Sequence, residues 1–263
     1  MNEFEILRRN ILIAQYAYET QAIFDYALSQ EYSLPTNTQA YDNIIRDLVD
    51  NGLFSKLDYF NIFTKDGSNE FKLINTVNPG NPNASVEDTI LFEDDGVYKT
   101  SDIGAINTNL DLSLNTVDQK YKLNNACRFA VCLTEGGNII DGNSEIQGDN
   151  VLYHLASNSN SRINNQGSFS FNLNTSGLGF IGISRYSNNE VNVYNKDVLM
   201  QGNTISDKIS PNTQVLFRRG TVYGSALGLS CYGIGEHFSY EEVQLFRQLY
   251  NKYLLSVDLP QIA

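Results

Sequence analysis

The sequence predicts a mainly β fold, an antiparallel β-sandwich with a helical segment before it and one helix after it. Three observations lead to this class. Apolar residues alternate with polar ones through the middle of the 263-residue chain, the period-two pattern of strands. Of its 19 glycines, all except Gly52 fall between residues 61 and 237, where they supply turns between short strands. Both ends of the chain show helical spacing instead.

The N-terminal part, residues 1–60, is predicted to be a helical region that serves attachment or oligomerisation. A stripe of apolar side chains with three- and four-residue steps covers residues 4–18. This stripe is too short to hold a coiled coil alone, so it either seeds contacts between chains or packs on its own sandwich. A second helical segment places Ala22, Ile23, Tyr26 and Ala27 on one face.

A third helix follows the break at Leu34-Pro35. Residues 36–39 read as a capping box in which Thr36 is the N-cap and Gln39 reaches back to it. Apolar residues then recur at helical spacing from Tyr41 to Val49, and Asn51-Gly52 supplies a left-handed stop.

Residues 61–263 are predicted to form the sandwich and its C-terminal helix. The expected strand faces are Leu110, Leu112 and Leu114; Phe129, Val131 and Leu133; Phe169, Phe171 and Leu173; Val191 and Val193; Val215 and Phe217; and Leu227, Leu229 and Cys231. Each would leave a solvated face opposite. A second capping box at residues 239–242 starts the last helix, whose apolar stripe from Val243 to Val257 packs back on the sandwich.

Composition excludes several classes of partner. Lys+Arg 18 against Asp+Glu 30 gives a net charge of −12, which repels phosphate backbones and argues against nucleic-acid binding. No apolar run approaches the roughly 18 residues of a membrane span, and the acidic start does not fit a cleaved secretion signal. The three cysteines, Cys127, Cys132 and Cys231, form no Cys-x-x-Cys pair and are expected to be buried thiols.

Several short segments together resemble one known family. They are Leu34-Pro35 with the helix after it, residues 52–58, 63–67 and 73–75, Ile183-Ser184-Arg185, Val193-Tyr194-Asn195-Lys196 and Gly233-Ile234-Gly235. Over about residues 20–257 the chain resembles tailed-bacteriophage virion structural proteins that carry a concanavalin A-like (laminin-G-like) jelly roll behind a small helical region. The resemblance implies that fold and a virion component or surface adhesin, without a catalytic set. Asp197 stands near the position where the family often has a turn glycine.

Catalytic constellations are not found in the sequence. Concanavalin-like glucanases alternate carboxylates along one strand, as in Glu-x-Asp-x-x-Glu, and this chain has no such run. Its acidic run Glu93-Asp94-Asp95 is expected to be a solvated turn. His154 and His237 lie far from any Gly-x-Ser-x-Gly elbow, so they are interpreted as hydrogen-bonded or surface histidines. We therefore expect no enzymatic activity.

One loop offers oxygen ligands at alternate positions, as a calcium ion prefers. The candidate metal ligands are Asp141, Asn143, Glu145 and Asp149. The pattern departs from an EF-hand because its glycine falls at the second position, so a hydrophilic turn without any cofactor is the competing interpretation. The similar segment at residues 66–70 is weaker.

Glycan binding combines an exposed aromatic ring with polar side chains that pair with hydroxyl groups. The candidate ligand-binding residues are Arg185, Tyr186 and Asn188 in one turn and Tyr223 in another. The competing interpretation is that these tyrosines cover a sheet edge.

Two functions of different classes stay open. The first is an exposed head or tail appendage of a phage virion, a fibre or decoration subunit made in the host cytoplasm. Its partners would be other virion proteins, copies of itself joined as a trimer through residues 4–18, and host-surface glycans. The second is a glycan-binding lectin module. A glycoside hydrolase is the third and least favoured alternative.

Overall fold

The computed structural model describes most of the chain. The described residues are 16–64, 67–99, 103–114, 116–134, 139–143, 151–153, 159–164, 169–171, 178–196, 198–209, 211–219, 222–223 and 228–262. Among them, no helix is both long and apolar enough to cross a membrane.

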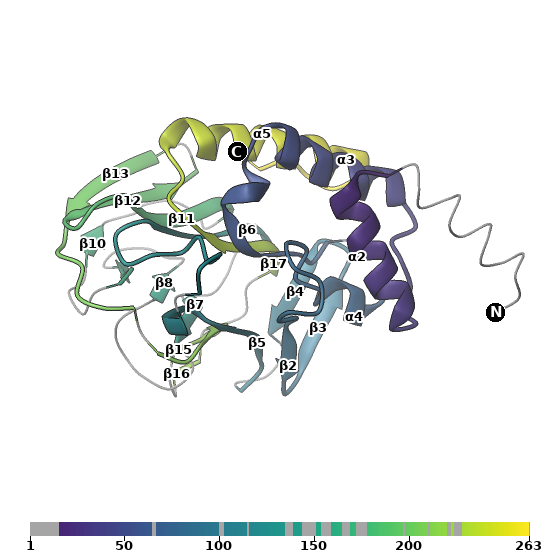
Figure 1. The fold of residues 1–263 in the computed structure, drawn as a ribbon, viewed down its shortest axis with the longest axis horizontal. Coiled ribbons are helices and arrows are strands. Elements are labelled where there is room, and N and C mark those ends of the chain that lie inside the picture. Colours follow the sequence, from purple (N-terminus) through teal and green to yellow (C-terminus); the bar gives the residue numbers. More distant parts are fainter. Residues whose placement is uncertain are drawn as a thin grey trace, which may run out of the picture.

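The elements stack in three layers, as Figure 1 shows: helices, an eight-stranded sheet, and a smaller five-stranded sheet. The helices are α2 (Tyr18–Ser29), α3 (Thr38–Asp50), α4 (Asn69–Lys72) and α5 (Tyr240–Ser256), with 3-10 turns η1 (Phe54–Lys56) and η2 (Leu112–Leu114). Helices α3 and α5 lie over the outer face of the large sheet.

The large sheet is antiparallel, with strand order β13-β12-β11-β6-β17-β4-β3, and β1 also pairs with β17. Its strands are β1 (Leu57–Ile62), β3 (Ile90–Glu93), β4 (Gly96–Lys99), β6 (Ala126–Thr134), β11 (Gly179–Arg185), β12 (Glu190–Asn195), β13 (Val198–Asn203) and β17 (Gly228–Gly235). The sandwich predicted from the sequence is therefore confirmed.

The small sheet has strand order β2-β5-β14-β7-β8 and faces the inner side of the large one. Its strands are β2 (Ser85–Glu87), β5 (Ala105–Asp111), β7 (Ile139–Asn143), β8 (Val151–Tyr153) and β14 (Thr213–Leu216). Two short ladders complete the described strands: β9 (Ser159–Ser161) with β10 (Phe169–Phe171), and β15 (Arg218–Arg219) with β16 (Val222–Tyr223).

The helix signals in the sequence hold, with one shift. Ser239 and Glu242 form the predicted capping box of α5. The cap of α3 is Asn37 rather than Thr36, because the Asn37 side chain accepts a hydrogen bond from the backbone N–H of Ala40 at 3.0 Å. Gln39 does not reach back to the cap as predicted, because its amide donates forward to Asn43 at 3.0 Å. The α3 helix ends at Asp50 with Asn51 as its C-cap, and Gly52 follows with a φ of +72°, the left-handed stop that was expected.

The expectation of a solvated face on every strand is wrong for the large sheet. Phe129, Val131 and Leu133 of β6 do share one face, but that face packs against the helices, while Ala130 and Cys132 point into the sandwich. Because helices cover the outer face, β6 is buried on both sides. Its period-two pattern therefore separates large apolar side chains from small ones rather than buried side chains from solvated ones. All three cysteines are buried free thiols, as predicted.

Two predicted strand faces are wrong for local reasons. The pairing of β17 with β6 changes register between Leu229 and Cys231, so Leu229 packs inside the sandwich and Cys231 packs toward the helices. After Asp111 the chain leaves β5 for the turn η2, which leaves Leu114 at 69% exposure instead of in line with Leu112.

An aromatic cluster joins the helices to the large sheet. The Phe129 ring lies 4.8 Å from Phe246 of α5 and 5.5 Å from Phe238, measured between centroids. Room for this ring exists because Phe129 pairs with a glycine on each neighbouring strand, Gly182 of β11 and Gly233 of β17. A Cβ atom at Gly233 would lie 2.3 Å from the Phe129 ring.

An ion pair crosses the interior between the two sheets. Arg128 of β6 donates to the Asp141 carboxylate of β7 at 2.5 Å, and Tyr232 of β17 donates to the other carboxylate oxygen. Both charged side chains are fully buried. The Asp141 carboxylate also accepts the backbone N–H of Leu152 at 2.9 Å. Burial raises the pKa of Asp141, against the charge of Arg128 and these hydrogen bonds, which lower it.

Some sequence predictions lie outside the described residues. They are residues 4–15 of the predicted stripe, His154, Leu173, Asp197 and Leu227. The proposed domain boundary at residue 60 falls within β1, and the division into two domains stays a prediction.

Adding a methyl group at Gly233 should destabilise the fold. We expect Gly233→Ala to lower the free energy of unfolding by about 2 kcal/mol, because the Phe129 ring must leave its place among the aromatic residues. Chemical denaturation measures this. In a Phe129→Leu background, Gly233→Ala should lower the free energy of unfolding clearly less, because the leucine side chain that the methyl group meets is smaller than the phenyl ring. Equal costs in the two backgrounds would contradict this packing.

Candidate functional site

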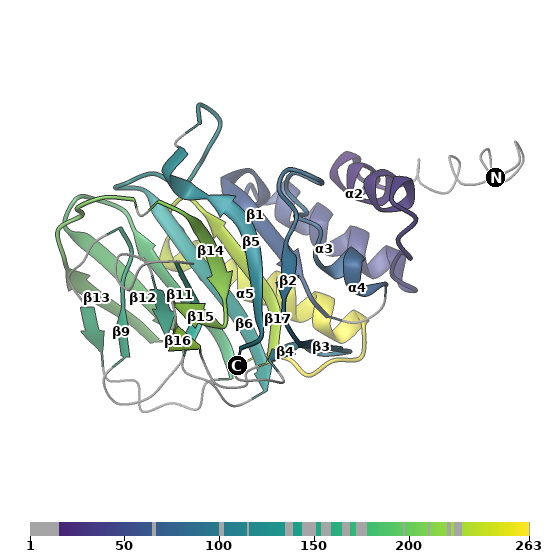
Figure 2. The ribbon, with the colours of Figure 1, turned by 90° about the horizontal axis from the view of Figure 1, so that it is seen from below.

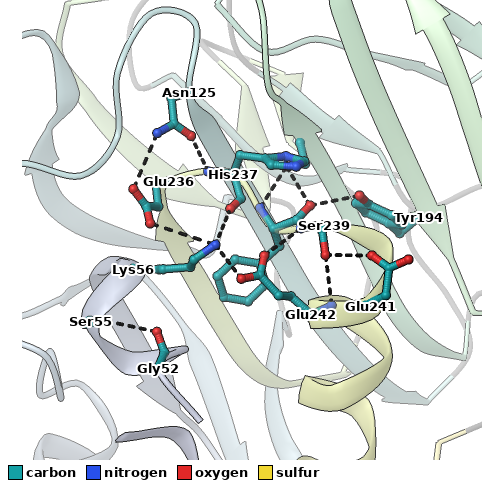
Figure 3. Close-up of polar contacts among 12 residues, drawn as sticks. Gly52, Ser55, Lys56, Asn125, Tyr194, Glu236, His237, Ser239, Glu241 and Glu242 are labelled. Atoms are coloured by element: carbon teal, nitrogen blue, oxygen red, sulfur yellow. Dashed lines mark hydrogen bonds and ion pairs between the residues drawn. The ribbon is translucent and has the colours of Figure 1, made fainter.

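Figure 3 shows a polar cluster at one end of the large sheet. It forms where the C-terminal ends of β17 and β11 lie next to the first turn of α5. His237 follows β17, and its Nδ1 lies 2.6 Å from the Oγ of Ser184, a residue of β11. Ser184 Oγ also accepts the backbone N–H of Phe238 at 3.1 Å. Ser184 is fully buried, so its hydroxyl holds the turn in place instead of meeting a ligand.

Charges surround this turn. Lys56 Nζ lies 2.5 Å from a carboxylate oxygen of Glu242 and 3.9 Å from one of Glu236, and it donates to the His237 carbonyl at 3.2 Å. Burial lowers the pKa of His237 below its ordinary value of 6.5, and Lys56 lowers it further while Glu242 opposes the shift. Burial and Lys56 both favour the uncharged imidazole.

Asn125 connects this turn to a surface pocket. Its side-chain oxygen accepts the backbone N–H of His237 at 2.8 Å, and its amide nitrogen lies 3.4 Å from Glu236. The pocket has a volume of about 580 Å³. Its lining residues are Ser113, Lys122, Leu123, Asn124, Asn125 and Ile209, and we call it the Asn125 pocket.

Two of the residues singled out in the sequence are linked to this pocket through intermediate residues, although neither belongs to its lining. The Oγ of Ser206 is within hydrogen-bond distance of both Asn124 Oδ1, at 2.5 Å, and Asn188 Oδ1, at 2.8 Å, so Asn188 belongs to the pocket rim. Tyr186 is 37% exposed, and its ring lies 5.1 Å from the His237 ring, which is itself one contact away from Asn125. Tyr186 and Asn188 share one turn, and their role in ligand binding stays a prediction.

Arg185 requires a correction, because it does not face a ligand. Its guanidinium group has no exposed surface and donates hydrogen bonds of 2.8–3.3 Å to backbone carbonyls. These carbonyls belong to Ile163, Ser187, Asn188 and Thr204. Arg185 thus orders the loops that carry Tyr186 and Asn188.

The remaining predicted ligands are not gathered in the described structure. Tyr223 belongs to β16, away from Tyr186 in the sheet order, and its side chain lies outside the described part. Asp141 is corrected from a loop ligand to the buried partner of Arg128. Asn143 ends β7 with its backbone opposite Gln214, while Glu145 and Asp149 lie outside the described residues. Within the described ranges no three His, Cys, Asp or Glu side chains gather as around a metal ion.

Sequence reasoning missed Lys122, Asn124 and Asn125. They form a tight turn before β6, in which the backbones of Lys122 and Asn125 bridge each other. The only signal was the pair of asparagines, which is equally typical of an ordinary turn. Their partners Ser206 and His237 are distant in sequence, so only the fold assembles the pocket.

Comparisons with known proteins identify the fold. No family model matches the chain, and no curated protein matches it in sequence. Among solved structures, similar ones include a mutant of HCR/D (TM-score 0.50, 14% identity, 74% of this chain and 53% of that one). Another is the binding domain of botulinum neurotoxin DC in complex with SialylT (TM-score 0.50, 12% identity, 74% and 52%). A third is Trypanosoma rangeli sialidase (TM-score 0.50, 9% identity, 80% and 39%). The chain spans about half the length of the first two.

Replacing Arg185 should cost stability. We expect Arg185→Met to lower the free energy of unfolding by about 3 kcal/mol, because four backbone carbonyls, one buried and three partly buried, lose a charged donor. Denaturant unfolding measures it. The control is Lys252→Met, which removes an ion pair from a side chain that is 65% exposed and should cost less than about 1 kcal/mol. If both variants unfold alike, Arg185 does not hold these loops.

Proposed function

We propose that this protein is a glycan-binding β-sandwich module that a bacteriophage virion displays as part of a head or tail appendage. The observation that carries glycan binding is the Asn125 pocket. Its volume lies within the range of small-molecule sites, about 300–1,000 Å³.

The chemistry of the pocket suits a sugar. Asn124 and Asn125 are exposed amides in the lining. Ser206 pairs with the side-chain oxygen of Asn124, and Asn125 is held by His237 and Glu236. An amide has two hydrogens and two lone pairs, so each side chain keeps some capacity to bond a sugar hydroxyl. Leu123 and Ile209 offer apolar surface to the C–H face of a ring. We propose that Tyr186, a partly exposed ring held against His237, adds an aromatic surface for the sugar outside the pocket lining.

Two of the similar structures support the proposal at the level of the fold. One, the botulinum neurotoxin DC binding domain, is in complex with SialylT, and another is a sialidase. They indicate that a sandwich of this kind is compatible with carbohydrate recognition.

The virion part of the proposal rests on the resemblance of the sequence to tailed-phage structural proteins. The module would then be made in the host cytoplasm, join other virion proteins, and form oligomers through residues 4–18. A free lectin module is the alternative. Mass spectrometry of purified particles distinguishes the two: we expect the chain at a fixed stoichiometry, and its absence from washed particles would favour the free lectin.

We further propose that the protein binds without catalysis and needs no cofactor. The Ser184–His237 pair supports this, because Ser184 has no exposed surface from which to attack a substrate. Release of reducing ends from bound polysaccharide would contradict it.

A glycan array tests the binding proposal. We expect the full chain to bind a set of related glycans, and Tyr186→Ala and Asn124→Ala each to weaken binding by about tenfold, or about 1.4 kcal/mol. Tyr18→Ala is the matched control, since this tyrosine is 81% exposed on α2 and should leave binding unchanged. Thermal unfolding should be the same in all three variants.

If the wild-type protein binds no glycan on the array, glycan binding is refuted. Binding that all three variants retain would place the site elsewhere on the molecule.

A further inference from the structure

A second hollow lies on the other side of the loop that borders the Asn125 pocket. It has a volume of about 470 Å³, and we call it the Asn81 groove. Its polar lining includes Asp58, Asn78, Asn81, Asn109, Asp111 and Asp118. Figure 2 shows the chain after β5 rising as a loop beyond the edge of the sheets, near the end of β1.

The two hollows share this loop as a common wall. Ser113 lines the Asn125 pocket, while Leu114, Thr116 and Asp118 line the Asn81 groove. The Nζ of Lys122, in the first hollow, donates to the carbonyl of Thr116 in the second at 3.2 Å. The two hollows are therefore neighbours, and only this loop separates them.

The walls of the groove are held by side chains. Asp58 accepts the backbone N–H groups of Lys120 and Tyr121, both at 2.7 Å, which fixes the shared loop to β1. On the opposite wall, Asn109 donates to the carbonyl of Asn83 at 2.9 Å. A groove with both walls fixed in this way does not need to be ordered by its ligand.

The shared loop is also braced from within. Gln119 is 9% exposed, and its amide donates to the carbonyls of Leu112 at 2.7 Å and Tyr121 at 3.0 Å. At the crest, Leu114 is 69% exposed and Val117 98% exposed. The loop thus presents apolar side chains between two hollows whose linings mix apolar and polar residues, which suits the alternating C–H and hydroxyl surface of a sugar chain.

Charge selects the kind of chain. The groove carries three carboxylates, from Asp58, Asp111 and Asp118, against the single cation Lys120. The whole protein carries −12. Both fields disfavour a polyanion and tolerate neutral or cationic sugars.

We propose that the Asn125 pocket and the Asn81 groove bind successive units of one linear oligosaccharide that crosses the loop of residues 112–120. The ligand class is a neutral or amino-sugar polysaccharide rather than a terminal acidic sugar. This inference rests on the proposed glycan-binding function. It adds the length of the ligand, its path across the loop and its charge.

The dependence of affinity on chain length tests the inference. The probes are N-acetylglucosamine and maltose oligomers from disaccharide to hexasaccharide, with hyaluronan oligomers as the acidic series, titrated calorimetrically into the full chain. For one neutral series we expect affinity to rise at least about tenfold from disaccharide to hexasaccharide. Hyaluronan should bind more weakly at every length.

Variants separate the two hollows. Asn78→Ala with Asp118→Ala should remove the gain with length and leave disaccharide binding unchanged, whereas Asn124→Ala should weaken every length. Asp94→Ala, at an exposed turn away from both hollows, is the control and should change neither.

Each outcome has a distinct meaning. Affinity independent of length, a gain that survives the groove variants, or a preference for hyaluronan would overturn the extended site while leaving glycan binding intact. Failure of both neutral series, with another glycan bound on the array, would overturn the ligand class. Failure of every glycan on the array would refute the proposed function and this inference with it.

Discussion

Packing of Phe129 against α5 is the contact on which the rest of the arrangement depends. Its ring reaches Phe246 because Gly182 and Gly233, its partners on both neighbouring strands, carry no side chain to block it. Fixing α5 on the sheet also fixes where the helix begins, and the turn before it carries His237. That turn holds Asn125 and therefore one wall of the pocket. The position of the surface pocket therefore depends on the packing of Phe129 in the core.

Two buried arginines perform different tasks in the same interior. Arg128 is neutralised by Asp141 across the two sheets, an arrangement that adds specificity of sheet pairing more surely than net stability. Arg185 is satisfied mainly by backbone carbonyls and organises the loops at the rim. Buried polar groups thus order both the pairing of the sheets and the loops at their edge.

The sequence predicted what local patterns determine. Helix α5 was found because its capping box and apolar stripe are both short-range signals, and the sandwich was found from alternation. The change of register beside Cys231 could not be found, since it depends on how β17 meets β6. Tyr186 follows β11 in a turn and is partly exposed, as the turn residues around it indicated, while its role as a ligand contact stays a prediction. Arg185 was misassigned because its burial is set by loops far from it, and Asn125 was missed because its partner is more than a hundred residues away.

An NMR titration of the isotopically labelled protein with a neutral hexasaccharide tests the central claim most directly, because it locates the ligand without any substitution. The account predicts that backbone amide signals of Asn124, Asn125, Tyr186 and the loop of residues 112–120 shift together and saturate together. Shifts confined to the helical face of α3 and α5, or no shifts from any hexasaccharide tested, would contradict it.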